Sequence, residues 1–298
     1  MEIFLQQIVN GLVLGSVYAL VALGYTMVYG IMGLINFAHG EVVMIGALVS
    51  ISVMQVFFAG APGLSPVFLV LGALAVAIPV CMAIGYTIER VAYRPLRHAP
   101  RLAPLITAIG VSIVLQNLAM MIWGRGYISF PPIFPTTSHD IFGARITDVQ
   151  VTIIVMAVVI MAALLTLVNK TRMGRAMRAT AENPAVAGLM GVNINAVISF
   201  TFIIGSALAA IAGMMVSANY GIAHYFMGFM LGLKAFTAAV LGGLLLGLIE
   251  SLGAGYIGQL TGGFLGSHYQ DVFAFFVLIL VLVFKPSGLI GERVSERA

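Results

Sequence analysis

The sequence predicts an all-α protein, a polytopic bundle of transmembrane helices with about eight to nine spans. Of its 298 residues, 61% are hydrophobic and 8% are charged, whereas roughly 25% of residues are charged in soluble domains. The apolar residues form runs of about 20 residues, the length a helix needs to cross the ~30 Å hydrocarbon core. Basic residues gather at the ends of these runs. We therefore expect one membrane domain over residues 1–298.

The apolar runs follow one another with short connections. They lie at about 6–30, 40–59, 64–88, 102–123, 149–168, 195–218, 226–241, 242–260 and 270–284. All of them must be helices, because an open strand leaves backbone groups unpaired in lipid. The run at 226–241 is short for a full crossing, so we expect a broken or re-entrant segment near 226–243.

Basic residues indicate which loops are cytoplasmic. The three clusters are Arg90, Arg94, Arg97 and Arg101; Lys170, Arg172, Arg175 and Arg178; and Lys285, Arg293 and Arg297. Since Lys and Arg concentrate on the cytoplasmic side, the segments 89–101 and 169–194 and the tail from Lys285 are predicted to be cytoplasmic. The segment 124–148 and the N-terminus then lie outside. An even number of crossings must separate the last two clusters, so 226–241 and 242–260 either form two crossings or re-enter.

Several function classes lack their sequence signals. No Gly-x-x-x-x-Gly-Lys-Ser/Thr loop is present, so we expect no ATP site or other cofactor in this chain. The five histidines are scattered without metal-ligand spacing. There is no Gly-x-Ser-x-Gly elbow and no basic, aromatic segment for nucleic acid. The single Cys81 is expected to be a small core residue. The start Met1–Phe4 lacks the basic region of a signal peptide, so the first run should remain a span. We predict that the chain is not an enzyme and binds no metal.

Small residues recur at the spacing that lets helices pack closely in lipid. They are Gly205, Ala209 and Gly213; Gly228 and Gly232; and Gly243 and Gly247. Packing within the bundle is the simplest interpretation.

The basic loop 169–194 contains an unusual apolar stretch. Glu182-Asn183-Pro184 can end one short helix and begin another, because Asn caps helices and Pro suits the first turn. The residues from Ala185 to Met190 are small and apolar, which a solvated loop does not need. Such a surface favours docking into a groove on another protein. An amphipathic helix along the membrane interface is the alternative.

Four stretches together resemble the LivH-type permeases of branched-chain amino acid ABC importers. They are residues 174–193 (GRAMRATAENPAVAGLMGVN), 24–41 (GYTMVYGIMGLINFAHGE), 90–97 (RVAYRPLR) and 285–291 (KPSGLIG). They match, in that order, the family's coupling segment, N-terminal signature, first cytoplasmic loop and C-terminal ending. The resemblance runs nearly end to end.

The resemblance implies a permease subunit of the bacterial inner membrane that couples to an ATPase through the loop. The implied coupling residues are Gly174, Arg175, Arg178, Ala181, Glu182, Asn183, Pro184, Ala187, Gly188 and Gly191. The implied partners are a second, related permease chain, two cytoplasmic ATP-binding subunits and a periplasmic substrate-binding protein, within membrane lipid and without nucleic acid. The implied substrates are leucine, isoleucine and valine.

The chain departs from the family at one point. The family usually has a Gly-rich insertion, two Gly-Gly pairs about a dozen residues apart, before an apolar run that ends in Glu. Here Gly242-Gly243 leads directly into Leu244 and on to Glu250. The omission shortens the connection between two predicted spans. A true deletion and a missing loop are both compatible with this pattern.

Polar residues inside the apolar runs are candidates for the translocation pathway, because an ionisable group at the bilayer centre costs ~2.5–3.5 kcal/mol. They are Asn36, His39, Gly40, Glu41, Lys234 and Glu250. A helix break at Gly40 would expose backbone dipoles to a zwitterionic substrate, although an ordinary polar turn fits too. Lys234 and Glu250 either pair or face the pathway. Gln116 and Asn117 are expected to form hydrogen bonds between helices.

Other functions remain open from the sequence. Closely similar permeases move urea or short amides. A membrane-embedded enzyme lacks its acidic and metal-ligand clusters here. A stand-alone transporter or channel would leave the docking segment without a purpose.

Overall fold

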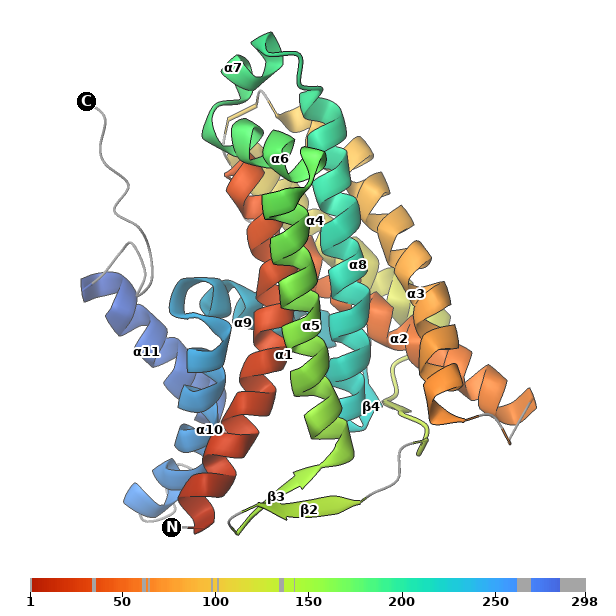
Figure 1. Cartoon of the computed structure of the whole chain (residues 1–298), viewed down its shortest axis with the longest axis vertical. Helices are drawn as coiled ribbons and strands as arrows, with labels where there is room; N and C mark the ends of the chain where they lie inside the picture. Colours follow the sequence, from red (N-terminus) through yellow and green to blue (C-terminus); the bar gives the residue numbers. More distant parts are fainter. Residues whose placement is uncertain are drawn as a thin grey trace.

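The computed structural model describes residues 2–33, 36–60, 63, 65–97, 99–100, 102–133, 137–141, 143–261 and 269–284. Long helices dominate it (Figure 1), which confirms the all-α bundle. Within these residues, six helices are long and apolar enough to cross a membrane: α1 (Glu2–Met32), α2 (Ala38–Gly60), α3 (Pro66–Ile88), α4 (Leu102–Trp123), α5 (Asp148–Lys170) and α8 (Ile194–Tyr220).

Shorter elements complete the fold. The helices are α6 (Arg172–Glu182), α7 (Pro184–Leu189), α9 (Met227–Leu241), α10 (Gly243–Leu260) and α11 (Gln270–Phe284). A π-helical turn, η1 (Glu89–Tyr93), and a 3₁₀ turn, η2 (Arg94–Leu96), continue α3. Two small antiparallel sheets pair β1 (Ile128–Ser129) with β4 (Ile222–Ala223), and β2 (Ser138–Ile141) with β3 (Ala144–Thr147).

The predicted number of eight to nine spans is not confirmed. Among the described residues, six helices qualify as spans, α9 and α10 form one pair bent by 115°, and α11 is a shorter apolar helix. The predicted break near 226–243 is confirmed, and it lies at Gly242. That residue has a φ of +87°, a left-handed conformation that Gly adopts without the steric cost other residues incur.

The pair α9–α10 enters the bundle and returns (Figure 1). Gly243 lies against Ala19, and Gly247 lies against Gly15, so α10 runs antiparallel to the first half of α1. The bend is therefore near the middle of α1. In Figure 1, α8 and α10 both end toward the N-terminal end of the bundle, so α9 and α10 together form a re-entrant segment.

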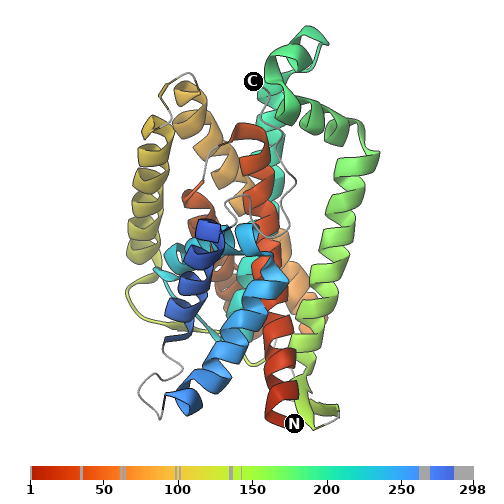
Figure 2. The same cartoon turned by 90° about the vertical axis from the view of Figure 1, so that its left-hand side faces the viewer.

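Three helices form the centre of the bundle. In their most apolar stretches, 72% of α1, 67% of α8 and 56% of α2 is buried, against 28%, 22% and 17% for α3, α4 and α5. Figure 2 shows α4 and α5 on opposite flanks, where their apolar side chains are available to lipid. The sequences of α1, α2 and α8 are therefore constrained by one another more than by the bilayer.

The small residues of α8 pack as predicted. Gly205 lies against the backbone of Gly24 in α1, and a methyl group added at Gly213 would overlap the carbonyl of Val43 in α2. At both positions two helix backbones lie close together, which increases the van der Waals contact that holds helices together in lipid. The small residues of α8 therefore allow this helix to pack closely on α1 and α2 at the centre of the bundle.

The two ends of the bundle differ in charge. One end, called here the basic end, holds residues 89–97 and the helices α6 and α7. The opposite end holds the N-terminus and the β2–β3 hairpin (Figure 1). This arrangement agrees with the sides predicted from the basic clusters. The cluster from Lys285 onward lies outside the described residues.

Candidate functional site

A charged cluster lies inside the bundle, where α1, α9, α10 and α11 meet. The ammonium of Lys234 is 2.8 Å from Asp271 Oδ1 and 3.2 Å from Glu250 Oε2, and it donates a hydrogen bond to the Tyr18 hydroxyl at 3.0 Å. That hydroxyl in turn donates to Glu250 Oε2 at 2.7 Å. Lys234 is 8% exposed and Glu250 is 1% exposed. We call Tyr18, Lys234, Glu250 and Asp271 the charged cluster.

Pairing explains how these charges are tolerated in an apolar interior. A buried ionised group is costly unless a partner and hydrogen bonds compensate it. The predicted pairing of Lys234 with Glu250 is confirmed. Sequence reasoning missed Tyr18 and Asp271, since Tyr18 lies in the first apolar run and Asp271 at the edge of the last. Neither position stands out until the helices are assembled.

The junction of α1 and α2 buries three polar side chains. Asn36 is 5% exposed and accepts a hydrogen bond from the Tyr93 hydroxyl at 2.7 Å. His39 is 2% exposed and packs against Gly24. Glu41 is fully buried. These side chains are therefore inside the bundle and are not exposed on its surface.

Glu41 is held from a second helix. Its Oε1 accepts hydrogen bonds from the Ser112 hydroxyl at 2.9 Å and from the Gln116 amide at 2.7 Å, both on α4. The prediction that Gln116 bonds between helices is confirmed. The same prediction for Asn117 is wrong, because its amide donates to the Ile113 carbonyl of its own helix at 2.8 Å.

The chain breaks earlier than predicted. α1 ends at Met32, Gly33 has a φ of +62°, and α2 begins at Ala38, so Gly40 is already helical. Gly40 serves close packing instead, since an added methyl group would overlap the carbonyl of Gly228 in α9. The prediction of a break at Gly40 is therefore wrong. The break precedes α2 because the left-handed Gly33 ends α1.

The loop 169–194 forms two short helices with side-chain caps. Thr171 Oγ1 accepts from the Gly174 amide at 2.9 Å and begins α6. Asn183 Oδ1 accepts from the Val186 amide at 3.1 Å and begins α7, with Pro184 in its first turn. These caps satisfy backbone donors that would otherwise lack partners. The predicted helix boundary at Asn183 is confirmed.

The apolar residues of α7 face solvent. Leu189 is 87% exposed, Met190 is 81% exposed and Val186 is 52% exposed, while Ala187 is 3% exposed and packs inward. A groove of about 420 Å³ lies beside them. It is lined by Ala179, Glu182, Asn183, Val186, Ala187, Met190 and Val192. We call Val186, Leu189 and Met190 the α7 patch.

The other predicted coupling residues surround this patch. Arg178 donates to the Val168 carbonyl, which ties α6 to the end of α5. Gly174 is buried against Val168, where a methyl group would overlap its carbonyl. Gly191 ends the segment with a φ of +84°. The remaining predicted residues are exposed: Arg175, Ala181, Glu182, Pro184 and Gly188.

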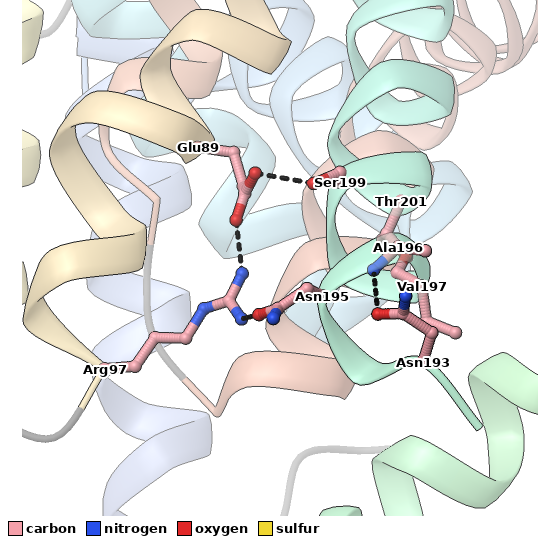
Figure 3. Close-up of polar contacts among 8 residues, drawn as sticks. All are labelled: Glu89, Arg97, Asn193, Asn195, Ala196, Val197, Ser199 and Thr201. Atoms are coloured by element: carbon pink, nitrogen blue, oxygen red, sulfur yellow. Dashed lines mark hydrogen bonds and ion pairs between the residues drawn. The ribbon is translucent and has the colours of Figure 1, made fainter. Parts of the chain in front are cut away.

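A buried ion pair in the first basic loop is bonded to the start of α8 (Figure 3). Glu89 is fully buried at the end of α3, where it pairs with Arg97 and accepts a hydrogen bond from Ser199 of α8 at 2.7 Å. Arg97 also donates to Asn195 Oδ1 at 2.5 Å. We call Glu89, Arg97, Asn195 and Ser199 the loop clasp. Glu89 was not predicted from the sequence. A carboxylate directly before an Arg-rich loop is a natural partner for one of its arginines, and this was the available signal.

The loop clasp lies next to the α7 patch in the chain. Asn193 follows α7 directly, and its Oδ1 accepts from the Ala196 amide at 3.1 Å to begin α8 (Figure 3). Asn195 and Ser199 are therefore in the first two turns of α8. The π-helical turn at Glu89 adds a local irregularity of the kind found at functional sites. The end of α7 and the loop clasp are therefore close together in the chain.

The described residues contain no group of three or more His, Cys, Asp or Glu side chains that could hold a metal ion. The structure brings together Lys234 and Glu250, and separately Asn36, His39, Gly40 and Glu41, while the coupling residues lie apart at the basic end.

Comparison with known proteins gives consistent matches over nearly the whole chain. The sequence profile described as "branched-chain amino acid transport system / permease component" matches residues 7–282. The high-affinity branched-chain amino acid transport system permease protein BraD of Pseudomonas aeruginosa is 44% identical over 99% of this chain and 98% of its own length. The protein named LivH of Escherichia coli K12 is 44% identical over 99% and 97%.

More distant relatives agree. A probable branched-chain amino acid transport permease protein LivH of Methanocaldococcus jannaschii is 28% identical over 95% of this chain and 91% of its own length. No solved structure matches. This multi-pass membrane protein belongs to the family of permease components of branched-chain amino acid transport systems.

Proposed function

We propose that this chain is the permease subunit of an ABC importer that moves leucine, isoleucine and valine across a bacterial inner membrane. In this proposal it pairs with a second, related permease chain to form the translocation pathway. Two cytoplasmic ATP-binding subunits supply the energy, and a periplasmic binding protein delivers the substrate. Family membership supports each part.

One observation carries the proposal: the exposed α7 patch at the basic end. Leu189 and Met190 are more than 80% exposed, although burying a large apolar side chain is worth ~1.5–3 kcal/mol. The patch lies beside a groove and directly before the loop clasp. In a chain without a nucleotide-binding loop, an ATPase is the partner that would cover it.

The loop clasp suggests how the energy is transmitted. When the ATPases close, α7 would move with them, and Asn193 and Asn195 would carry that movement into the first turns of α8. Because Glu89 bonds to both Arg97 and Ser199, α3 would follow α8. α8 packs on α1 and α2 through Gly205 and Gly213, so the helices around the charged cluster would shift. The pathway would then change from outward to inward opening.

The predicted pathway residues fit this scheme in two groups. Lys234 and Glu250 are in the charged cluster near the middle of α1, where a substrate must cross the bilayer centre. Gly40 and Glu41 hold the start of α2 against α9 and α4, while Asn36 and His39 contact Tyr93 and Gly24. Their arrangement suits a gate, because a shift of α9 would break the Gly40–Gly228 contact.

Urea or a short amide is the second candidate for the substrate. Both are neutral, so neither would use the charged cluster in the way an amino acid would. A membrane-embedded enzyme or a stand-alone transporter would leave the α7 patch without a partner.

Transport by the purified complex tests the proposal. The complex of both permeases and both ATPases is reconstituted in proteoliposomes with the cognate binding protein, and uptake of labelled leucine is measured. We expect ATP-dependent uptake that unlabelled isoleucine and valine reduce and urea does not. A complex whose ATPases cannot hydrolyse ATP is the control. Uptake without ATP, or competition by urea but not by valine, would contradict the proposal.

A further inference from the structure

A pocket connects the opposite end of the bundle with the charged cluster. It has a volume of about 360 Å³, within the ordinary range for small-molecule sites. Its lining consists of Tyr127, Val216, Tyr220, Ile222, Ala223, His224, Phe226, Met227, Met230, Leu231, Lys234 and Asp271. We call it the outer pocket. Of these twelve lining residues, only Lys234 and Asp271 are charged, and both belong to the charged cluster. The other ten are His224 and nine aliphatic or aromatic residues.

The outer pocket reaches from the opposite end to the middle of the membrane domain. Tyr127 and Ile222 belong to the region of the β1–β4 sheet, and the ring of Tyr127 stacks on His224 at 4.7 Å. At the inner limit, Lys234 bonds to Tyr18, which lies near the middle of α1. Substrate sites near the bilayer midplane, beside broken helices, are common in transporters. α9 is such a broken helix.

The charges at the inner limit do not balance. The cluster contains one ammonium, on Lys234, and two carboxylates, on Glu250 and Asp271. The ammonium donates hydrogen bonds to Tyr18 and Glu250 and forms an ion pair with Asp271 at 2.8 Å. An incoming carboxylate would therefore meet two carboxylates already gathered around Lys234. The side chain of Asp271 is 32% exposed and lines the pocket, whereas Glu250 is 1% exposed, so Asp271 is the carboxylate that an incoming cation can reach.

We propose that the outer pocket is a transient binding site for an amino acid, whose α-ammonium pairs with Asp271 while its aliphatic side chain lies against Met227, Met230 and Leu231. The α-carboxylate points toward the open mouth and stays hydrated. The ammonium supplies the positive charge that the cluster lacks. This inference rests on the proposed function and adds to it the residue that distinguishes an amino acid from a neutral amide.

The site should bind weakly. Only one of the two substrate charges is paired, and the pocket is open, so little of the substrate is desolvated. Weak binding suits a pathway, because conduction requires that the substrate also leave. Lys234 acts here as a positioning residue that holds Asp271 toward the pocket.

Ligand-observed NMR tests the site directly. The permease–ATPase complex, without binding protein, is placed in nanodiscs, and saturation transfer to L-leucine is measured. We expect transfer to leucine in the wild type and a dissociation constant about tenfold or more higher in Asp271→Asn, because a hydrogen bond between charged groups is lost. Met230→Trp, which fills the pocket, should abolish the transfer. Met121→Trp is the control, since Met121 is 78% exposed on α4.

Competition in the wild type identifies the recognised group. Isoamylamine carries the ammonium and the branched chain, and we expect it to displace leucine. 4-Methylpentanoate carries the carboxylate instead and should not. Equal displacement by both compounds, no transfer in the wild type, or full transfer in Met230→Trp would overturn the proposal.

Uptake in proteoliposomes separates the two proposals. If the wild-type complex imports leucine and both Asp271→Asn and Met230→Trp import it equally well, the outer pocket is not on the route, and the proposed function stands. If the wild-type complex imports no leucine, the proposed function itself fails.

Discussion

Two buried charged side chains of this bundle, Lys234 and Glu41, have their partners on other helices. Lys234 has three partners and Glu41 has two, and each set of contacts spans more than one helix. The cost of a buried ion is met only when its partners are present. A substitution at one position therefore acts on the helices that supply the partners.

Gly40 gives the clearest prediction at this scale. Gly40→Ala would place a methyl group into the Gly228 backbone, which cannot rotate away. Overpacking of this kind costs ~1–3 kcal/mol, so we expect a melting temperature several degrees lower in detergent. Gly30→Ala is the control, because it lies in α1 with nothing within 4 Å of the added atom. Equal melting temperatures for the two variants would show that α2 and α9 do not touch here.

The sequence predicts some of these residue contacts. Lys234 and Glu250 stand out because charged residues are rare in apolar runs, and their pairing follows from the cost of leaving them apart. Tyr18 and Asp271 do not stand out, since their role depends on how four helices assemble. The helix break was wrongly placed at Gly40 because glycine at a break and glycine at a close contact look alike in one sequence.

At the scale of elements, the loop clasp connects the first basic loop to the start of α8. Its four residues come from a π-helical turn, the residue after a 3₁₀ turn and the start of α8. The Arg-rich loop was predicted as a topological signal alone. Its contact with α8 could not be predicted, because α8 is more than 90 residues away in the chain.

Uncoupling is the expected effect of breaking the loop clasp. Arg97→Gln removes the ion pair with Glu89 and the hydrogen bond to Asn195, so the loop after α3 should follow α8 less closely. We expect ATP hydrolysis stimulated by the loaded binding protein to persist, while the leucine transported per ATP falls severalfold. Arg90→Gln is the matched control, since Arg90 is in the same loop and exposed. An unchanged ratio of transport to hydrolysis in Arg97→Gln would exclude the loop clasp from coupling.

At the scale of the whole molecule, the regions proposed to act in transport lie at different depths of the bundle. The α7 patch and the loop clasp are at the basic end, where Figure 1 shows α6 and α7. The charged cluster is near the middle of α1, and the outer pocket extends from it to the region of the β1–β4 sheet. Composition and basic clusters predict the helical bundle and the side of each loop. They do not predict the span count, because the re-entrant pair α9–α10 is as apolar as a crossing helix.

Energy transfer through the α7 patch is the central claim, and co-purification tests it most directly. The chain is co-expressed with its partner subunits, solubilised in detergent and captured by a tag on the permease, and the retained ATPase is quantified. The double variant Leu189→Ser/Met190→Ser removes two exposed apolar anchors, each worth about 2 kcal/mol if it is a binding hot spot. Met121→Ser, equally exposed on α4, is the control. We predict that wild type and Met121→Ser retain the ATPase and that the double variant loses it at least about tenfold. Equal retention by the double variant, or no ATPase with the wild type, would contradict the account.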